Sequence, residues 1–85
     1  MGYFPASYNQ ARAITKSDTV NFDINLNGGL CDAIWVGGAG IVKAIFQDGS
    51  DAEFTCAAGT LLPVRAKRVQ SATTTATLMV AMYSI

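Results

Sequence analysis

Turn-forming residues recur about every ten residues along this chain, so each segment between them has the length of a short β-strand. The turns stand at Ser17-Asp18, Asn27-Gly28-Gly29, Gly37-Gly38-Ala39-Gly40, Asp48-Gly49 and Gly59. The segments between them show no sustained 3.6-residue period and no helix caps. The sequence therefore predicts an all-β fold, a single small antiparallel β-sandwich or barrel, jelly-roll-like, with about seven or eight strands.

Three segments are predicted to form strands, one of them short and two of them exposed to solvent on one face. Residues 12–17 form a short expected strand that ends in a turn. Residues 19–26 alternate apolar side chains, Ile24 among them, with polar ones, which predicts a half-buried strand. Residues 52–56 alternate in the same way after Asp48-Gly49, a dipeptide typical of tight β-hairpins.

Two segments are apolar on both faces, and a third contains proline. Residues 30–36, which include Trp35, and residues 73–85 are expected to form strands covered on both sides. The segment 60–70 contains Pro63, which lacks a backbone N–H. Its strand is therefore expected at a sheet edge, or to begin at this proline.

The glycine-rich link from Gly37 to Gly40 raises the question of phosphate binding. A Walker loop needs Gly-Lys followed by Ser or Thr, and a dinucleotide-binding loop must open a helix. The link lacks that lysine motif, and it leads into residues 41–46, whose β-branched and aromatic residues favour a strand. We therefore expect a turn that joins two antiparallel strands, because glycine readily adopts positive φ.

The composition argues against several kinds of chemistry. The chain has no histidine, the commonest general base and metal ligand, and its net charge of zero argues against nucleic-acid binding. Cys31 and Cys56 are expected to be small apolar core residues, with a bridge between them left open. No apolar run reaches the length of a membrane span. We expect no enzyme activity, no metal, no cofactor, no membrane and no direct nucleic-acid partner.

The chain carries more apolar residues than a small solvated domain needs. Hydrophobic residues make up 51% and charged residues 14%, so some apolar surface should meet another subunit or a larger assembly. Residues 1–11 are expected to form an N-terminal arm, and residues 12–85 a single β-domain. Tyr3, Phe4 and Tyr8 in the arm are expected to contact a neighbouring subunit, with a disordered end as the alternative.

A concentrated positive patch, Arg65, Lys67 and Arg68, is a second candidate interface. One interpretation is a solvated edge-strand face that discourages aggregation. The other is a set of salt bridges to an acidic partner surface. A change of alternation at Arg68-Val69 also indicates a bulge. The last strand adds further candidates for subunit contacts, Met79, Met82 and Tyr83.

Three motifs recur in order along the chain: AITKSDTVNF, AIWVGGAGIVKAIFQDGS, and GTLLPVRAKRV followed by TTAT and an apolar end. Together they resemble a family of small tailed-phage virion proteins that includes the spike-base proteins of bacterial gene transfer agents. The resemblance covers about residues 13–83. The family often has proline at the position of Lys16, and the arm before Ala11 has no counterpart.

The resemblance implies a structural role on the outer surface of a phage head, as a capsid decoration (cement) protein or a head spike-base subunit. It implies a protein made in the host bacterial cytoplasm that forms a homotrimer on the virion. Its partners would be the major capsid protein and a fibre or spike protein. The alternative is a tail or baseplate β-domain that adheres to host glycan, with Trp35 and Tyr83 as stacking platforms.

Overall fold

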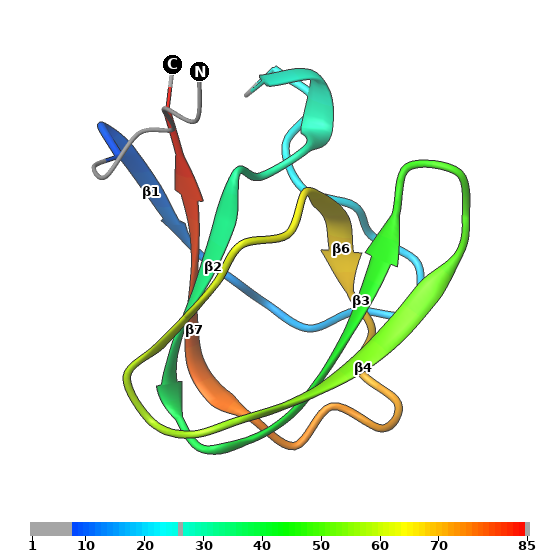
Figure 1. Ribbon diagram of the computed structural model, residues 1–85. Helices are drawn as coiled ribbons and strands as arrows, with labels where there is room; N and C mark the ends of the chain where they lie inside the picture. Colours follow the sequence, from blue (N-terminus) through cyan, green and yellow to red (C-terminus); the bar gives the residue numbers. More distant parts are fainter. Residues whose placement is uncertain (1–7, 26, 85) are drawn as a thin grey trace, which may run out of the picture.

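The computed structural model describes residues 8–25 and 27–84, whose strands form two antiparallel sheets (Figure 1). One sheet has four strands in the order β1-β7-β2-β5, and the other has three in the order β4-β3-β6. The predicted all-β fold with about seven strands is confirmed. The strands are β1 (Gln10–Ala13), β2 (Ala33–Gly38), β3 (Gly40–Phe46), β4 (Asp51–Cys56), β5 (Thr60–Leu62), β6 (Ala66–Val69) and β7 (Thr77–Tyr83), and a 3-10 turn, η1 (Asn27–Gly29), precedes β2.

The hydrophobic core lies between the two sheets. Its buried residues are Cys31, Ile34, Val36, Val42, Ala44, Cys56, Leu62, Ala66, Val69, Ala76, Met79, Ala81 and Tyr83. Every strand except β1 supplies at least one of these side chains, whereas all four residues of β1 are exposed. Strand β1 is therefore held mainly by its pairing with β7 and contributes little to the core.

The first strand lies earlier in the chain than the predicted 12–17. Strand β1 ends at Ala13 because the chain then crosses from the four-stranded sheet to β6. The Ile14 N–H still donates to Met79 O of β7 at 3.0 Å, and the Ser17 N–H donates to Val69 O of β6 at 3.0 Å. Residues 14–17 thus connect the two sheets at one side of the sandwich.

The glycine-rich link carries the chain from one sheet to the other. It connects two strands, as predicted, but the expected hairpin is wrong: β2 pairs with β5 and β7, and β3 pairs with β4 and β6. A Cβ atom on Gly38 would collide with the Thr77 hydroxyl, and one on Gly40 would lie 2.5 Å from the Ala76 nitrogen. Glycine is required because the chain entering β7 lies directly against this corner.

The connection between β3 and β4 is the hairpin that Asp48-Gly49 predicts. The Phe46 N–H donates to Ser50 O at 2.8 Å, and Gly49 adopts a φ of 90°. The Asp48 carboxylate accepts the Ser50 hydroxyl at 2.6 Å and the Ser50 N–H at 3.0 Å. These hydrogen bonds hold the pKa of Asp48 below its ordinary value.

Residues 19–25 do not form the predicted half-buried strand 19–26, whose last residue, Leu26, lies outside the described residues. Residues 19–25 follow an irregular path beside β6, to which Phe22 donates its backbone N–H. The Ser17 hydroxyl accepts the Val20 N–H at 2.9 Å, and such local side-chain bonds compete with a strand ladder. Val20 and Ile24 are accordingly 68% and 75% exposed.

The segment 60–70 forms two strands in different sheets. Strand β5 is an edge of the four-stranded sheet and β6 an edge of the three-stranded sheet, with Pro63 between them. The Val64 N–H donates back to Leu62 O at 2.9 Å, which marks a sharp change of direction. The expected edge position is therefore confirmed, and the expected single strand is wrong.

The threonine-rich segment before β7 completes the hydrogen bonding of β3. The hydroxyl of Thr74, a residue only 6% exposed, accepts the Lys43 N–H at 3.0 Å. The Thr75 hydroxyl accepts the Ile41 N–H at 2.9 Å. These side chains take the place of a neighbouring strand, so β7 begins only at Thr77 and not at the predicted start of the 73–85 strand.

Both cysteines are free and buried, which confirms their expected place in the core. Burial raises the pKa of the Cys31 thiol above its ordinary value of 9.0, and burial likewise raises the pKa of Tyr83. We expect the free energy of unfolding to fall as the pH rises above about 9. The reason is that the unfolded thiol ionises there, whereas the folded chain keeps it protonated until its raised pKa is passed.

Urea unfolding followed between about pH 8 and pH 11 measures this decline. A Cys31→Ala variant should show a shallower decline, with the remainder due to Cys56 and Tyr83. A free energy of unfolding that stays constant or rises over this range would contradict the expectation.

Candidate functional site

The outer face of the four-stranded sheet carries only apolar residues. Residues directly opposite each other in antiparallel strands share a face, so the register of the sheet defines this surface. One row across all four strands consists of Ala13, Val80, Trp35 and Leu61, and the next row consists of Ala11, Met82 and Ala33. The same alternation along β2 and β7 adds Gly37 and Leu78. We call these nine residues the apolar face.

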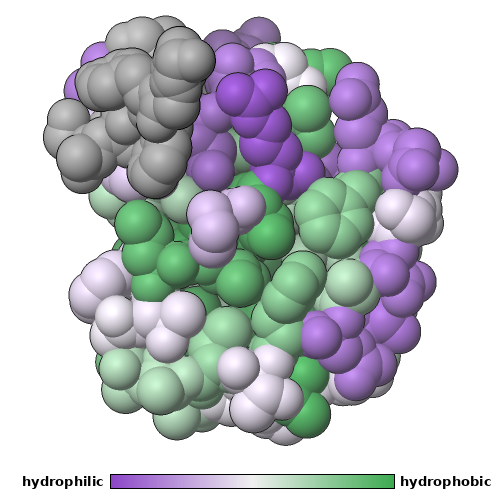
Figure 2. Space-filling model, in the orientation of Figure 1, coloured by the Kyte–Doolittle hydropathy of each residue, from purple (hydrophilic) through white to green (hydrophobic). Residues whose placement is uncertain are grey.

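The outer face of the three-stranded sheet is different in kind. Lys43 lies opposite Glu53, and Ile45 lies opposite both Asp51 and Arg68. Figure 2 shows hydrophilic residues gathered over the β3–β4 hairpin. One outer face of the sandwich is therefore suited to water, and the other is suited to contact with protein.

Several side chains of the apolar face are open in the single chain. Trp35 and Leu61 are each 42% exposed, and Leu78 is 78% exposed. The sequence predicts two-sided cover for Trp35 and for the last strand. The outer side is covered unevenly. Ala33 is fully buried and Val80 and Met82 are half-buried, whereas Trp35, Leu61 and Leu78 are open, so the expectation of two-sided burial is wrong for Trp35 and Leu78 in the isolated chain.

Leu78 has an unfavourable backbone as well as an exposed side chain. Its φ is 53°, in the left-handed region that glycine and asparagine tolerate best. This conformation costs a leucine about 1–2 kcal/mol, and its exposure adds a second cost in water. Both the backbone conformation and the solvent exposure of Leu78 are unfavourable in the single chain. This combination indicates that the Leu78 side chain contacts another chain.

The predicted contact residues of the last strand lie on opposite sides of it. Met79 and Tyr83 are 4% and 1% exposed and belong to the domain's own core. Met82 is half-buried and lies on the apolar face opposite Ala11 and Ala33. The proposal of subunit contacts therefore rests on Met82 and its neighbours. Tyr3 and Phe4 lie outside the described residues, and Tyr8 is half-buried just before β1.

The basic residues do not form one free patch. Arg65, whose side chain is 73% exposed, lies 3.6 Å from the Asp32 carboxylate, and Arg68 donates to the Asn21 side chain at 3.1 Å. A bulge is present in β6, but one residue before the predicted Arg68-Val69. Lys67 is its extra residue, because consecutive residues of β3 oppose Arg68 and Ala66. Two of the three cations thus already have partners within the chain.

The carboxylates do not form a catalytic pair. Asp32 precedes β2 in the four-stranded sheet, whereas Glu53 lies in β4 of the other sheet. Besides its contact with Arg65, Asp32 accepts the Ser84 N–H at 2.7 Å, which fastens the end of β7. Within residues 8–25 and 27–84, no three His, Cys, Asp or Glu side chains are grouped to hold a metal ion. In that same part of the chain no helix has the length and apolarity to cross a membrane.

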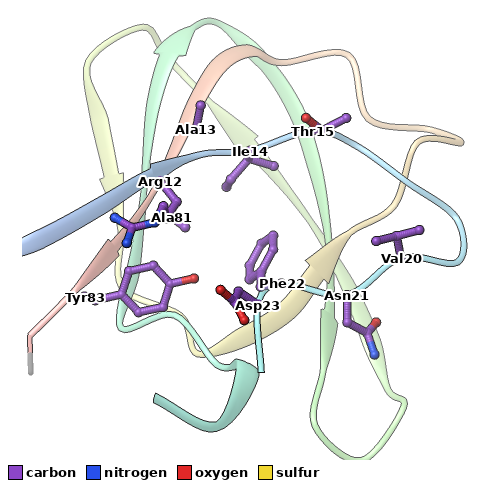
Figure 3. Close-up of a pocket in the computed structure, with 10 residues that line it drawn as sticks. All are labelled: Arg12, Ala13, Ile14, Thr15, Val20, Asn21, Phe22, Asp23, Ala81 and Tyr83. Carbon is purple, nitrogen blue, oxygen red and sulfur yellow. The ribbon is translucent and has the colours of Figure 1, made fainter. Parts of the chain in front are cut away.

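A pocket of about 250 Å³ lies between β1, the end of β7 and residues 20–23 (Figure 3). The Tyr83 ring points across it toward Asp23, with Arg12 on the β1 side. The sequence contains no motif that indicates this pocket, because the residues that line it are far apart in the chain. Its cation and anion come from different segments, and neither stands beside a nucleophile and base arranged for group transfer.

Searches of protein-family models and of curated proteins return no match to this chain. A solved structure, the capsid of a native gene transfer agent (GTA) particle computed with C5 symmetry, contains a similar chain. The two are 29% identical, with a TM-score of 0.77 over 89% of this chain and 83% of that chain. In sequence and in fold, this protein is thus similar to a chain of a GTA capsid.

Proposed function

We propose that this chain is a structural virion protein on the outer surface of a phage-type head, acting as a capsid decoration (cement) protein or as a head spike-base subunit. The observation that carries the proposal is the similarity to a chain of a GTA capsid over 89% of the length. That similarity supports a capsid-associated structural role. The choice between cement and spike base is our proposal.

The two unlike outer faces fit such a role. A subunit that adds to a shell needs one surface for its neighbours and another that stays wet. The apolar face provides the first, because removing apolar surface from water contributes about 25 cal/mol per Å². The charged outer face of the three-stranded sheet, with Lys43 and Glu53, provides the second.

The proposed assembly is a homotrimer that contacts the major capsid protein and, in the spike-base role, seats a fibre. Closed symmetry buries the same surface on every copy and leaves none unpaired. Native mass spectrometry of the purified protein measures the number of copies per oligomer, and a mass other than that of three copies would contradict the proposed trimer.

Co-sedimentation with empty expanded heads tests the capsid role. We expect the protein to pellet with heads to a fixed saturating ratio and to remain in solution with host envelope fragments. A spike-base subunit should saturate at a few sites per head, whereas a cement protein should saturate at a number comparable to the capsomers. Absence of head binding by a correctly folded oligomer would overturn the proposed function.

The alternative, a tail or baseplate domain that binds host glycan, has one observation in its favour. Trp35 is 42% exposed, so its ring is open to stacking, whereas Tyr83 at 1% is not. An isolated indole among apolar neighbours lacks the polar groups that orient a sugar. Binding to host envelope in preference to heads would support this alternative.

A further inference from the structure

We propose that the apolar face is the binding surface for residues 1–7, the first part of the N-terminal arm, of a neighbouring copy of this chain. The proposal rests on the proposed function, because it assumes an oligomeric subunit. It names the segment that covers the apolar face and the residues that receive it. The first argument concerns charge, the second direction, and the third area.

The arm and the apolar face are alike in having no charged side chains. No Asp, Glu, Lys or Arg precedes Arg12 in the sequence, and the arm contains Tyr3, Phe4 and Pro5. The apolar face consists of alanine, glycine, leucine, valine, methionine and one tryptophan. Contact between the two surfaces therefore buries no unpaired charged side chain, which would be costly. The charged outer face of the other sheet offers no such match.

The direction of β1 favours a neighbour's face over the chain's own. Gln10 lies opposite Tyr83, and the Asn9 N–H donates to Tyr83 O at 2.9 Å, so the chain is fastened to β7 from Asn9 onward. The chain therefore enters the four-stranded sheet at the end where β7 finishes. A chain that reached its own Trp35 would have to reverse there. Seven extended residues span at most about 25 Å, which is enough to reach an adjacent copy.

The size of the apolar face also favours an arm. Four strands, each about 4.8 Å wide, and about 24 Å long at the length of β7, give a surface of at most roughly 460 Å². A stable protein interface buries about 800 Å² on each partner. Flat contact between two such faces is therefore too small, whereas an exchanged arm adds contact area on both the donor and the receiving copy.

Trp35 makes the proposal measurable, because it is the only tryptophan in the chain and lies in the central row of the apolar face. We expect the oligomer to show Trp35 emission at shorter wavelength than a variant lacking residues 2–7. The deletion should also lower the native mass to that of a monomer. A peptide of residues 1–9 added to the deletion variant should shift the Trp35 emission back.

Leu78→Asn provides a variant that separates docking from folding. Asparagine suits the left-handed backbone, so the monomer should be as stable as the wild type or more stable. Leu78 is 78% exposed on the apolar face, so loss of its side chain should weaken arm binding about tenfold, the size of loss found for a contact residue that contributes to binding. Thr55→Asn, at an exposed position of β4 in the other sheet, is the matched control and should change neither oligomer mass nor Trp35 emission.

Three results would overturn the proposal. Trp35 emission that stays at short wavelength on dilution to monomer would place the arm on its own chain. A shift of the Trp35 emission to shorter wavelength only after heads are added would show that the apolar face contacts the capsid and not the arm. An unchanged oligomer after deletion of residues 2–7 would exclude the arm as the connection. The binding of each variant to heads is measured in a separate co-sedimentation experiment. An incorrect arm proposal can therefore be distinguished from an incorrect capsid role.

Discussion

A Gly40→Ala variant is expected to be strongly destabilised. A Cβ atom at this position would lie 2.5 Å from the Ala76 nitrogen and 2.7 Å from the Thr75 carbonyl carbon. Both contacts are with backbone, so no side-chain rotation relieves them, and the φ of 154° is rarely adopted by residues other than glycine. We expect a loss of more than about 4 kcal/mol, against a total of about 4–13 kcal/mol for a chain of this length.

Gly49→Ala is the matched control for this prediction. Gly49 also has a positive φ, of 90°, but no atom lies within 4 Å of a Cβ built there. Its replacement should cost only the backbone strain, about 1–2 kcal/mol. Circular dichroism and urea unfolding of both variants make the comparison. Equal losses for the two variants would show that the sheet-to-sheet corner is less tightly packed than these contacts imply.

Ile34→Ala is expected to cost about 2–5 kcal/mol of unfolding free energy. Ile34 is fully buried in β2, opposite Leu62 on one side and Ala81 on the other, at the centre of the inner face. Its truncation removes apolar contact and leaves a cavity in a core with several small side chains. Chemical unfolding at low protein concentration, where subunit contacts do not contribute, measures this loss.

Ile24→Ala is the same substitution at a position that the sequence pattern treats as equivalent. Ile24 is 75% exposed beside β6, so the change should stay within about 0.5 kcal/mol. A loss as large as that of Ile34→Ala would mean that residues 19–26 are a half-buried strand after all. The pair thus tests the structural correction directly.

Local chemistry accounts for the features that the sequence predicts well. The hairpin at Asp48-Gly49 follows from a carboxylate that binds its own turn and a glycine that accepts positive φ. The one-sided alternation of β4 follows from Glu53 and Thr55 on its exposed side. Neither feature depends on distant parts of the chain, so the residues themselves were sufficient to predict them.

The incorrect predictions concern which segments join a sheet and which strands become neighbours in it. Residues 19–26 carry the alternation of a strand, but the Ser17 hydroxyl and the Asp23 carboxylate take local N–H groups. The glycine link has the composition of a hairpin, but its two strands bind different neighbours. Periodicity is a local property and does not specify which strands become hydrogen-bonded neighbours.

The candidate site was predicted in part. Apolar residues occur on both sides of β7 and around Trp35. This pattern predicted that one side packs in the core and that the other side contacts another chain. The sequence could not say which side faced the core, so Met79 and Tyr83 were grouped with Met82 as contact residues. Leu61 and Leu78 were missed, because their membership of the apolar face depends on register and on a backbone conformation.

The sequence alone determined that this chain is a set of short strands with no sustained helical period, and with more apolar side chains than one small core can bury. The tertiary structure decided how the strands divide between two sheets and which side of the four-stranded sheet stays uncovered. The physical reason is that the alternation of side chains between the two faces of a strand repeats every two residues, so it is a local property. Sheet membership depends instead on hydrogen bonds and close contacts between residues far apart in the chain, such as Gly40 with Ala76.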